Sequence, residues 1–330
     1  QSVCATPRES REKLFSMASP PVASPEHFVS YMNATVTPFH CVAECARRLR
    51  TAGFVELNER DAQWQLTPGG RYYFTRNGTA IVAFAVGAAY DPATSGAVIV
   101  GAHTDSPCPK LKPRSTLEKA GHVMLGVVGY GGALFHTWFD RDLTVAGRAL
   151  VRTRAPTTTD AASSSTSELH DKEVIASRLV RLGKPVCRIP TLAIHLTSAE
   201  ERSSGFKPNL QQHLPPMLAT GVRDALWKTP ATPATSSASS SSTPSASGAA
   251  TERHHPLLVR LIAEHLGVEA SDVVDFELQL CDTQPATVGG AADEFVFSGR
   301  LDNQACCYLG LESLIQETAT QTADKHVKMI

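Results

Sequence analysis

The sequence predicts an α/β fold with more than one domain, and three observations support this expectation. The chain has 330 residues, which is long enough for two domains with sizeable cores. Its content of 42% apolar and 19% charged residues is ordinary for a globular protein. Stretches with a helical period alternate with strand-like runs, and polar motifs follow two of these runs, where open α/β sheets form their binding sites.

Charge, hydropathy and cysteine content argue against several classes of protein. The formal net charge of −1 gives no electrostatic reason to bind nucleic acid or an anionic membrane. No apolar run approaches the ~18 residues of a membrane span. The eight cysteines include no CxxC pair and no dense spacing, so we expect reduced thiols and a cytoplasmic location. We therefore expect neither nucleic acid nor a membrane as a partner.

Two helices are predicted near the N-terminus. Residues 1–24 are polar and carry proline and serine, which is typical of a loose tail. The Ser-Pro pair that follows is typical of a helix start, and apolar residues then recur at helical spacing at Phe28, Met32 and Val36. A second helix is expected over residues 37–52, which a glycine follows.

The period of the sequence then changes to that of strands. Residues 71–76 and 79–86 are strand-like, and the Asn77-Gly78 pair between them is a strong signal for a hairpin. The short apolar run 97–102 suits a fully buried central strand. A polar motif that begins at His103 follows this strand directly.

The middle of the chain predicts strands that are interrupted by two loops. Residues 122–154 contain strand-like runs with a glycine break at 129–132. Residues 156–167 and 229–251 are rich in Ser and Thr and cannot bury enough apolar surface to offset their ordering entropy, so we expect mobile loops there. Between these loops, residues 192–196 have the pattern of a strand.

The last third of the chain predicts two further helices and strands. Residues 255–266 have a helical period, residues 273–280 are strand-like, and a helix is expected over residues 304–317. The chain ends in the apolar, strand-like run 326–330. Because the chain begins with glutamine and stops as this run has just begun, we expect both ends to be cut.

Two motifs at strand ends are candidate metal sites. In His103-Thr-Asp105, the imidazole is a good zinc ligand and the carboxylate can fix its tautomer. In Arg300-Leu-Asp302-Asn303, the carboxylate could bridge two metal ions. Each motif taken alone also has a structural interpretation, in which Asp105 caps a turn and Asp302 or Asn303 caps the following helix.

Two other polar groups favour structural interpretations. The charged run from Trp138 to Asp142 is typical of an ion-pair corner. His254 and His255 open a predicted helix, where histidines are usually solvated or act as caps. No GxSxG element is present for a serine hydrolase, and the glycine break lacks the spacing of a phosphate-binding loop.

Taken together, the motifs resemble one family closely. Five segments occur in the order seen in the aspartyl aminopeptidases, namely Gly101–Pro107, Thr137–Leu143, Arg188–Leu196, Asp282–Pro285 and Arg300–Asn303. The resemblance implies a catalytic α/β domain, with a mixed sheet flanked by helices and a two-zinc centre. It also implies an inserted, mainly-β dimerisation domain. On this basis we expect residues 25–108 and 282–330 to form the catalytic domain and 109–281 the inserted one.

The resemblance also implies roles for individual residues. His103 would ligate one zinc ion while Asp105 holds its ring, and Asp302 would bridge both ions. His195 would reach the active site of a neighbouring subunit in a homo-oligomer, where it would bind substrate or stabilise the oxyanion. From the residues alone, His195 is expected to be a strand histidine that faces a core or the surface.

The resemblance implies removal of N-terminal Asp or Glu from peptide substrates. The general base and the remaining metal ligands of the family would lie beyond Ile330, so the chain itself is expected to be inactive. Two alternatives stay open from the sequence. One is a non-catalytic assembly protein on the same scaffold, and the other is a related two-zinc peptidase of different specificity.

Overall fold

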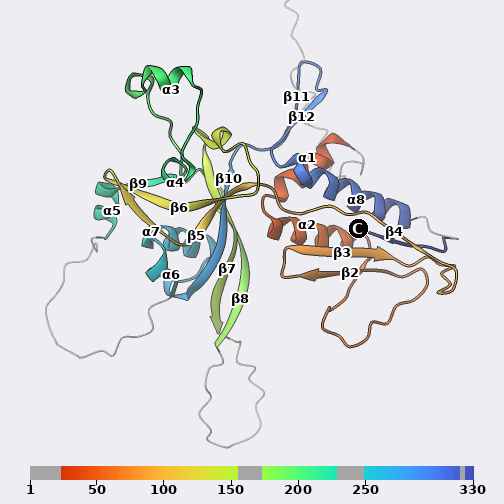
Figure 1. The fold of residues 1–330 in the computed structure, drawn as a ribbon. Helices are drawn as coiled ribbons and strands as arrows, with labels where there is room; N and C mark the ends of the chain where they lie inside the picture. Colours follow the sequence, from red (N-terminus) through yellow and green to blue (C-terminus); the bar gives the residue numbers. More distant parts are fainter. Residues whose placement is uncertain (1–23, 155–172, 229–248, 320–323) are drawn as a thin grey trace, which may run out of the picture.

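The computed structural model describes residues 24–154, 173–228, 249–319 and 324–330. These residues form two main sheets and a two-stranded hairpin (Figure 1), and each main sheet has its own core. Helices cover the mixed first sheet, and the predicted α/β class is confirmed. Of the described helices, none is both apolar and long enough to cross a bilayer.

The first sheet is five-stranded and mixed, in the order β1-β2-β3-β13-β4. Its strands are β1 (Val55–Glu56), β2 (Arg71–Arg76), β3 (Ala80–Ala85), β4 (Ala97–Ile99) and β13 (Val327–Met329). β3 runs antiparallel to both β2 and β13, whereas β4 runs parallel to β13. The run that ends the chain therefore takes an inner position between two strands that precede it by more than 200 residues.

The predicted hairpin is confirmed, with Arg76 paired to Ala80 across the turn. Asn77 and Gly78 both adopt positive φ, at 54° and 69°. This is the backbone conformation that a tight turn between right-twisted strands requires and that Asn-Gly adopts readily. The local sequence was sufficient to specify this turn.

The expectation for the apolar run 97–102 was wrong. Its strand, β4, covers only three residues and lies at the edge of the sheet, where Ile99 is 67% exposed. Within the described residues its hydrogen-bonded neighbour is β13 alone, and Val98 and Val100 are 57% and 49% exposed. A continuous apolar run indicates that a strand suits burial, but which layers cover the strand depends on distant parts of the fold.

Three helices pack on the first sheet (Figure 1). They are α1 (Pro25–Ala34), α2 (Pro38–Thr51) and α8 (Leu301–Ala319). The hydroxyl groups of Ser24 and Thr37 accept backbone N–H groups of the first turns of α1 and α2, so both predicted helix starts are confirmed. Val36 lies past the end of α1 and packs instead on Ala146 and Cys281 of the second sheet.

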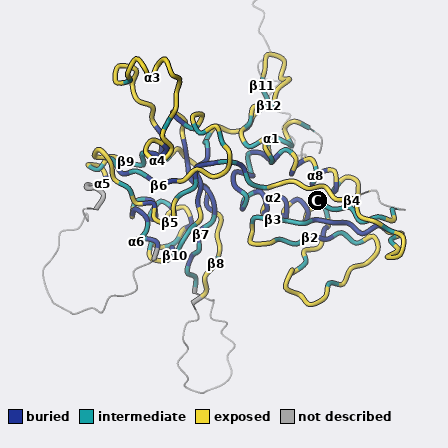
Figure 2. Tube along the Cα trace, viewed as in Figure 1, coloured by how far each residue is buried: buried dark blue, intermediate teal, exposed yellow. Residues whose placement is uncertain are grey.

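The core beneath these helices is aromatic and rich in thiols. Figure 2 shows stretches of α2 as buried. Tyr31, Leu49 and Tyr73 are fully buried, and Tyr308 packs on Tyr31 with ring centroids 5.3 Å apart. A buried ion pair between Arg48 of α2 and Glu312 of α8 crosses this core at 2.7 Å. The described cysteines are free thiols, as expected.

The second sheet is six-stranded and antiparallel throughout, in the order β8-β7-β10-β5-β6-β9. Its strands are β5 (Cys108–Lys119), β6 (His122–Tyr130), β7 (Leu143–Arg154), β8 (Glu173–Arg181), β9 (Met217–Thr220) and β10 (Val273–Asp282). The strands of this sheet come from residues 108–282, whereas those of the first sheet flank them in the sequence. The exact division into two domains remains a prediction.

Two helices complete the core of the second sheet, α6 (Ala249–Arg253) and α7 (Pro256–Leu266). His255 caps α7 by accepting the N–H of Leu257 at 3.2 Å, which confirms the capping interpretation of this histidine. The expectation that His254 is solvated was wrong. Its ring is buried against Phe276, with ring centroids 4.0 Å apart, and a ring nitrogen lies 2.8 Å from the Ser115 hydroxyl. Residues 249–251, expected in a mobile loop, form the start of α6.

The remaining elements are short and connect the two sheets or project from them. They are the helices α3 (Ala199–Ser203), α4 (Leu210–His213) and α5 (Gly221–Lys228), the 3-10 turns η1 (Phe135–Trp138), η2 (Ile194–Leu196) and η3 (Ala270–Asp272), and the hairpin strands β11 (Thr287–Gly289) and β12 (Phe295–Phe297). The expected tail up to residue 23, the loop at 156–167 and residues 229–248 of the second loop lie outside the described residues.

Candidate metal and substrate site

The polar motif after β4 is held in place by its neighbours in the fold. The Thr104 hydroxyl donates to the carbonyl of Thr79 at 2.6 Å, which attaches the loop to the β2–β3 turn. The Cys307 thiol donates to the carbonyl of His103 at 3.1 Å, and the amide of Gln304 donates to the carbonyl of Thr104. Because Gln304 and Cys307 belong to α8, the start of this helix positions the loop that carries His103.

Asp302 lies at the start of α8, where it and Asn303 depart from helical backbone angles. The Ser106 hydroxyl donates to the carbonyl of Asp302 at 2.8 Å. The carboxylate of Asp302 is 83% exposed and lies against the ring of His103. Within the described residues this carboxylate accepts no helix N–H, so the capping interpretation of Asp302 was wrong.

The structure brings His103, Asp105 and Asp302 together. Nε2 of His103 lies 3.1 Å from Oδ1 of Asp302, and Nδ1 lies 3.1 Å from Oδ1 of Asp105. Nδ1 also lies 3.0 Å from the backbone carbonyl oxygen of Asp105. A proton on Nδ1 is therefore satisfied by Asp105, and the lone pair of Nε2 then points toward Asp302.

Tyr130 is a member of this cluster that the sequence analysis missed. Its hydroxyl donates to Oδ2 of Asp105 at 2.7 Å. This hydrogen bond, followed by the nearby His103, lowers the pKa of Asp105, and the same bond raises the pKa of Tyr130 to about 12. The one available signal was the glycine break at 129–132, which contains this tyrosine and marks the end of β6 opposite Cys108 at the start of β5.

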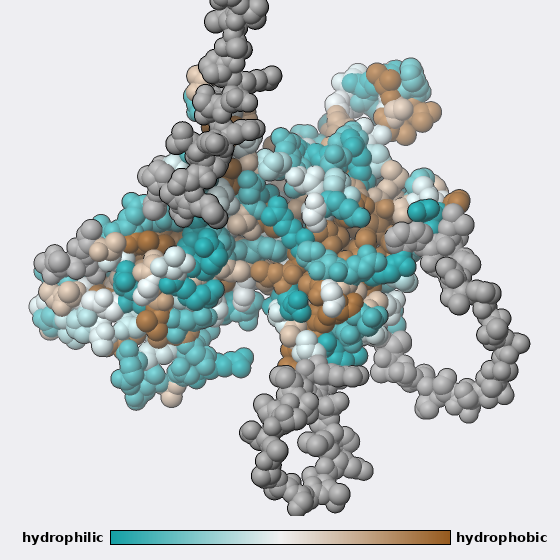
Figure 3. Space-filling view, turned by 180° about the vertical axis from the view of Figure 1, so that it is seen from behind, coloured by the Kyte–Doolittle hydropathy of each residue, from teal (hydrophilic) through white to brown (hydrophobic). Residues whose placement is uncertain are grey.

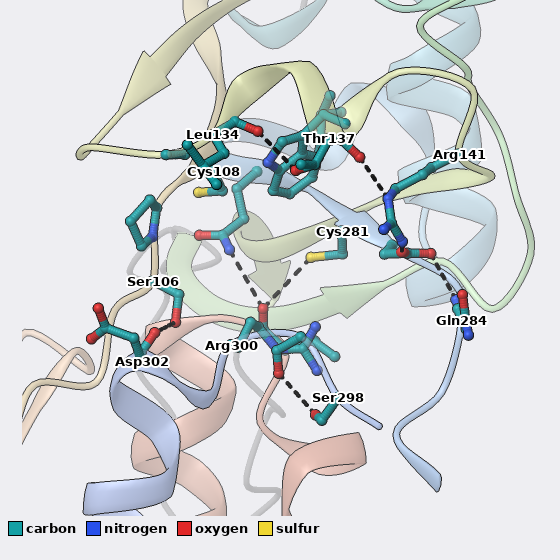
Figure 4. A pocket seen from close by; sticks show the side chains of 18 of the residues that line it. Ser106, Cys108, Leu134, Thr137, Arg141, Cys281, Gln284, Ser298, Arg300 and Asp302 are labelled. Atoms are coloured by element: carbon teal, nitrogen blue, oxygen red, sulfur yellow. Dashed lines mark hydrogen bonds and ion pairs between the residues drawn. The ribbon is translucent and has the colours of Figure 1, made fainter. Parts of the chain in front are cut away.

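A cavity of about 640 Å³ lies beside Asp302, between the second sheet and the start of α8 (Figure 4). Ser106 and Asp302 line it on one side, and Leu134, Thr137 and Arg141 line it on the other. Its volume lies in the range of about 300–1,000 Å³ that is usual for small-molecule sites. A group bound there would lie beside Asp302, whose carboxylate points away from the other labelled residues of the lining (Figure 4).

The charged run beside this cavity is an ion-pair corner, as predicted. Arg141 pairs with Asp282, and Asp142 pairs with Arg188 at 2.9 Å. The carboxylate of Asp140 accepts both the hydroxyl and the backbone N–H of Thr191. These contacts fix the chain directly after η1, and residues of η1 line the cavity.

His195 lies apart from the cluster, and its expected strand was wrong. It belongs to the 3-10 turn η2, on an exposed arm that continues into α3 (Figures 1 and 3). Apolar side chains around it face solvent, with Leu192, Ile194 and Leu196 all more than half exposed. Within the described residues, His195 makes no hydrogen bond or ion pair. Apolar alternation alone could not distinguish a packed strand from an exposed apolar arm.

The donor atoms of the cluster fit zinc in kind but not in number. An imidazole nitrogen with a fixed tautomer and a carboxylate oxygen are both ordinary zinc ligands. His103 and Asp302 present such atoms side by side, with Asp105 behind the ring. Among the described residues, however, no group of three or more His, Cys, Asp or Glu side chains is arranged to hold a metal ion.

Comparison with known proteins places the chain in a family. Residues 31–330 match the family model described as aminopeptidase I zinc metalloprotease (M18). The chain is 46% identical over 304 residues to a probable aspartyl aminopeptidase of Ricinus communis, with 91% of this chain and 58% of that protein covered. It is 39% identical over 300 residues to an aspartyl aminopeptidase of Dictyostelium discoideum, with 90% and 58% covered.

A solved structure extends the comparison to the fold. The structure of Chaetomium thermophilum mApe1 superposes with a TM-score of 0.73 at 35% identity, covering 93% of this chain and 62% of that one. The chain spans 58% of the length of each of the two relatives named above. With its fold, its ordered motifs and its sequence all in agreement, the chain belongs to the aminopeptidase I zinc metalloprotease (M18) family.

Proposed function

We propose that this chain supplies part of the active site of a zinc-dependent aminopeptidase that removes N-terminal Asp or Glu from peptides. The observation that carries the proposal is the alignment of Asp105, the His103 ring and Asp302, with both ring nitrogens 3.1 Å from a carboxylate oxygen. The family description as zinc metalloproteases supports the choice of metal. Relatives named aspartyl aminopeptidases support the acidic preference.

Each residue of the cluster has a distinct part in this proposal. Nε2 of His103 would hold one zinc ion and the carboxylate of Asp302 would be shared by two, while Asp105 holds the proton on Nδ1 of His103. Zinc, when bound, lowers the pKa of a coordinated water and polarises the scissile carbonyl. The general base and the cation that binds the acidic side chain of the substrate are not assigned to any residue of this chain.

His195 is proposed to act in trans, in the active site of a neighbouring subunit of a homo-oligomer. Its arm supports this role because it exposes His195 among the large apolar side chains of Leu192, Ile194 and Leu196. Exposed apolar residues that cluster on one arm are typical of a surface that another chain covers. A related structure at 26% identity is described as the mApe1 dodecamer of S. cerevesiae, which supports self-association.

The organisation and location of the protein complete the proposal. We propose that residues 25–108 and 282–330 form the catalytic domain and that 109–281 form an inserted dimerisation domain. The free thiols of the described cysteines support a cytoplasmic location, because such thiols persist in reducing compartments.

A second candidate function is a non-catalytic assembly protein on the same scaffold. The observation that favours it is the incomplete donor set, since the described residues hold no group of three metal-binding side chains. The two candidates differ in what His103 and Asp302 do. A peptidase needs them as metal ligands, whereas a scaffold needs them only for local structure.

Zinc titration of the purified chain separates these candidates. We expect weak zinc binding that is lost in His103→Ala and in Asp302→Ala. His122→Ala, which replaces a histidine whose ring lies 2.8 Å from the Ala120 carbonyl oxygen, should keep it. With only His103 and Asp302 as metal ligands, the chain should release no Asp from a peptide with N-terminal Asp. Zinc binding that is unchanged in both site variants would refute the metal site, and turnover by the chain would refute its expected inactivity.

A further inference from the structure

Tyr130 reaches the candidate metal site from a different part of the fold than the ligands do. It is the last residue of β6 in the six-stranded sheet, whereas His103 and Asp105 follow β4 of the five-stranded sheet. Its hydroxyl nevertheless donates to Oδ2 of Asp105 at 2.7 Å, while Oδ1 of the same carboxylate lies 3.1 Å from Nδ1 of His103. The two oxygens of Asp105 therefore link the two sheets at this point.

The ring of Tyr130 is itself held from the side of the second sheet. The ammonium group of Lys110 lies 4.4 Å from the centroid of this ring, which is within the range of a cation–π contact. Lys110 also pairs with Glu277 at 3.2 Å, so a residue of β10 fixes the ammonium group in turn. These contacts limit the movement of the Tyr130 hydroxyl, although the residue lies at the end of its strand.

We propose that Tyr130 is a positioning residue for His103 that acts through Asp105. A carboxylate with one oxygen held by Tyr130 cannot rotate freely, so its other oxygen stays aimed at Nδ1 of His103. The proton then stays on Nδ1, and Nε2 remains available on the side of Asp302. The inference rests on the proposed zinc site for its functional meaning, but the geometry that it describes exists in the chain without metal.

The variant that tests this role is Tyr130→Phe, which removes the hydroxyl and keeps the ring under Lys110. Removal of a group that orients a metal-binding histidine typically lowers metal affinity about 10–100-fold. Because Tyr130 contacts His103 only through Asp105, we expect zinc binding about 10-fold weaker, at the lower end of this range. In the Asp105→Asn background the same replacement should cause no further loss, because the hydroxyl would have no carboxylate to hold.

A matched control is available in the same chain. Tyr73 also donates its hydroxyl to a carboxylate at 2.7 Å, that of Glu56, but on the far strands of the first sheet. Tyr73→Phe should therefore leave zinc binding unchanged. Lys110→Met serves as a second variant, since it releases the ring from behind and should weaken zinc binding in the same direction as Tyr130→Phe.

A readout that does not depend on metal is the tautomer of His103, measured from the ¹⁵N chemical shifts of its ring at alkaline pH. In the wild-type chain we expect the proton on Nδ1, and in Tyr130→Phe we expect a shift of population toward Nε2–H, which would face Asp302. If the wild-type chain takes up no zinc, the proposed function fails, and the tautomer measurement alone then decides the role of Tyr130. Unchanged ¹⁵N shifts in Tyr130→Phe would overturn the inference. If the wild-type chain binds zinc, an equal zinc affinity of Tyr130→Phe would overturn it as well.

Discussion

Replacement of Arg48 by methionine is expected to destabilise the fold by about 3–5 kcal/mol, because it leaves a buried carboxylate without its cation. The guanidinium of Arg48 lies 2.7 Å from Oε1 of Glu312, and the two side chains are only 7% and 8% exposed. Methionine keeps most of the volume and the apolar stem of arginine, so little of this cost arises from a cavity.

The opposite replacement, Glu312→Gln, is expected to cost less, about 1.5–3 kcal/mol. The reason is that Arg48 keeps other partners, namely Glu44 at 2.7 Å and a ring nitrogen of His27 at 2.9 Å. The double variant Arg48→Met with Glu312→Met should recover most of the loss of Arg48→Met, because a buried ion pair and an apolar pair of similar volume are often equivalent.

Urea denaturation of the metal-free chain measures these differences, since bound zinc would add its own stabilisation. Arg47→Met is the control, because Arg47 pairs with the same Glu44 on the same helix but is 59% exposed. It should cost less than about 1 kcal/mol. If Arg48→Met were no more destabilising than Arg47→Met, the buried ion pair would not stabilise the contact between α2 and α8, and the reasoning would be refuted.

Three further predictions concern His195, His254 and Gly147. In the oligomeric protein, His195→Ala should lower kcat by about 10²–10³-fold, the size typical of an oxyanion donor, with zinc content and assembly intact; an unchanged kcat in steady-state assays would contradict its role in trans. Burial lowers the pKa of His254 from 6.5 to about 4, so the unfolded state takes up a proton that the folded state does not, and stability falls as pH drops from about 6.5 to 4. The slope of unfolding free energy against pH reports the difference in bound protons between the unfolded and folded states. His254→Asn should reduce this slope in that window by the equivalent of up to about one proton, and an unaltered slope would exclude this histidine as a cause. Gly147→Ala should destabilise by at least about 1–3 kcal/mol, because φ is 155° and a Cβ would lie 2.0 Å from the Glu277 carbonyl oxygen; Gly183→Ala, which has open space around it, is the control in thermal unfolding.

Local features of the fold were predictable from the sequence because their causes are local. The serine and threonine caps of α1 and α2 and the Asn77-Gly78 turn all depend on backbone preferences within a few residues. The closeness of His103 and Asp302 was also expected, although 199 positions separate them, because the resemblance linked their motifs. Without that resemblance, each short motif favoured a structural interpretation.

Features that depend on how distant segments meet were not predictable. The exposure of β4 follows from its position at the sheet edge, and the burial of His254 follows from its packing on Phe276 of β10. Tyr130 escaped notice because nothing in its own strand indicates that a carboxylate from the other sheet lies at its hydroxyl. A sequence pattern reports which environment suits a residue, and the packing of the whole chain decides which neighbours it has.

The position of β13 in the first sheet has a consequence for the order in which the protein forms during synthesis. Every strand of the second sheet is complete once residue 282 has been made, so this sheet can fold while the rest of the chain is still being translated. β4, made much earlier, gains its described hydrogen-bonded partner only when residues 327–329 emerge and enter between it and β3. The part of the protein that carries His103 and Asp302 therefore closes after the second sheet, whose strands lie between these two residues in the sequence.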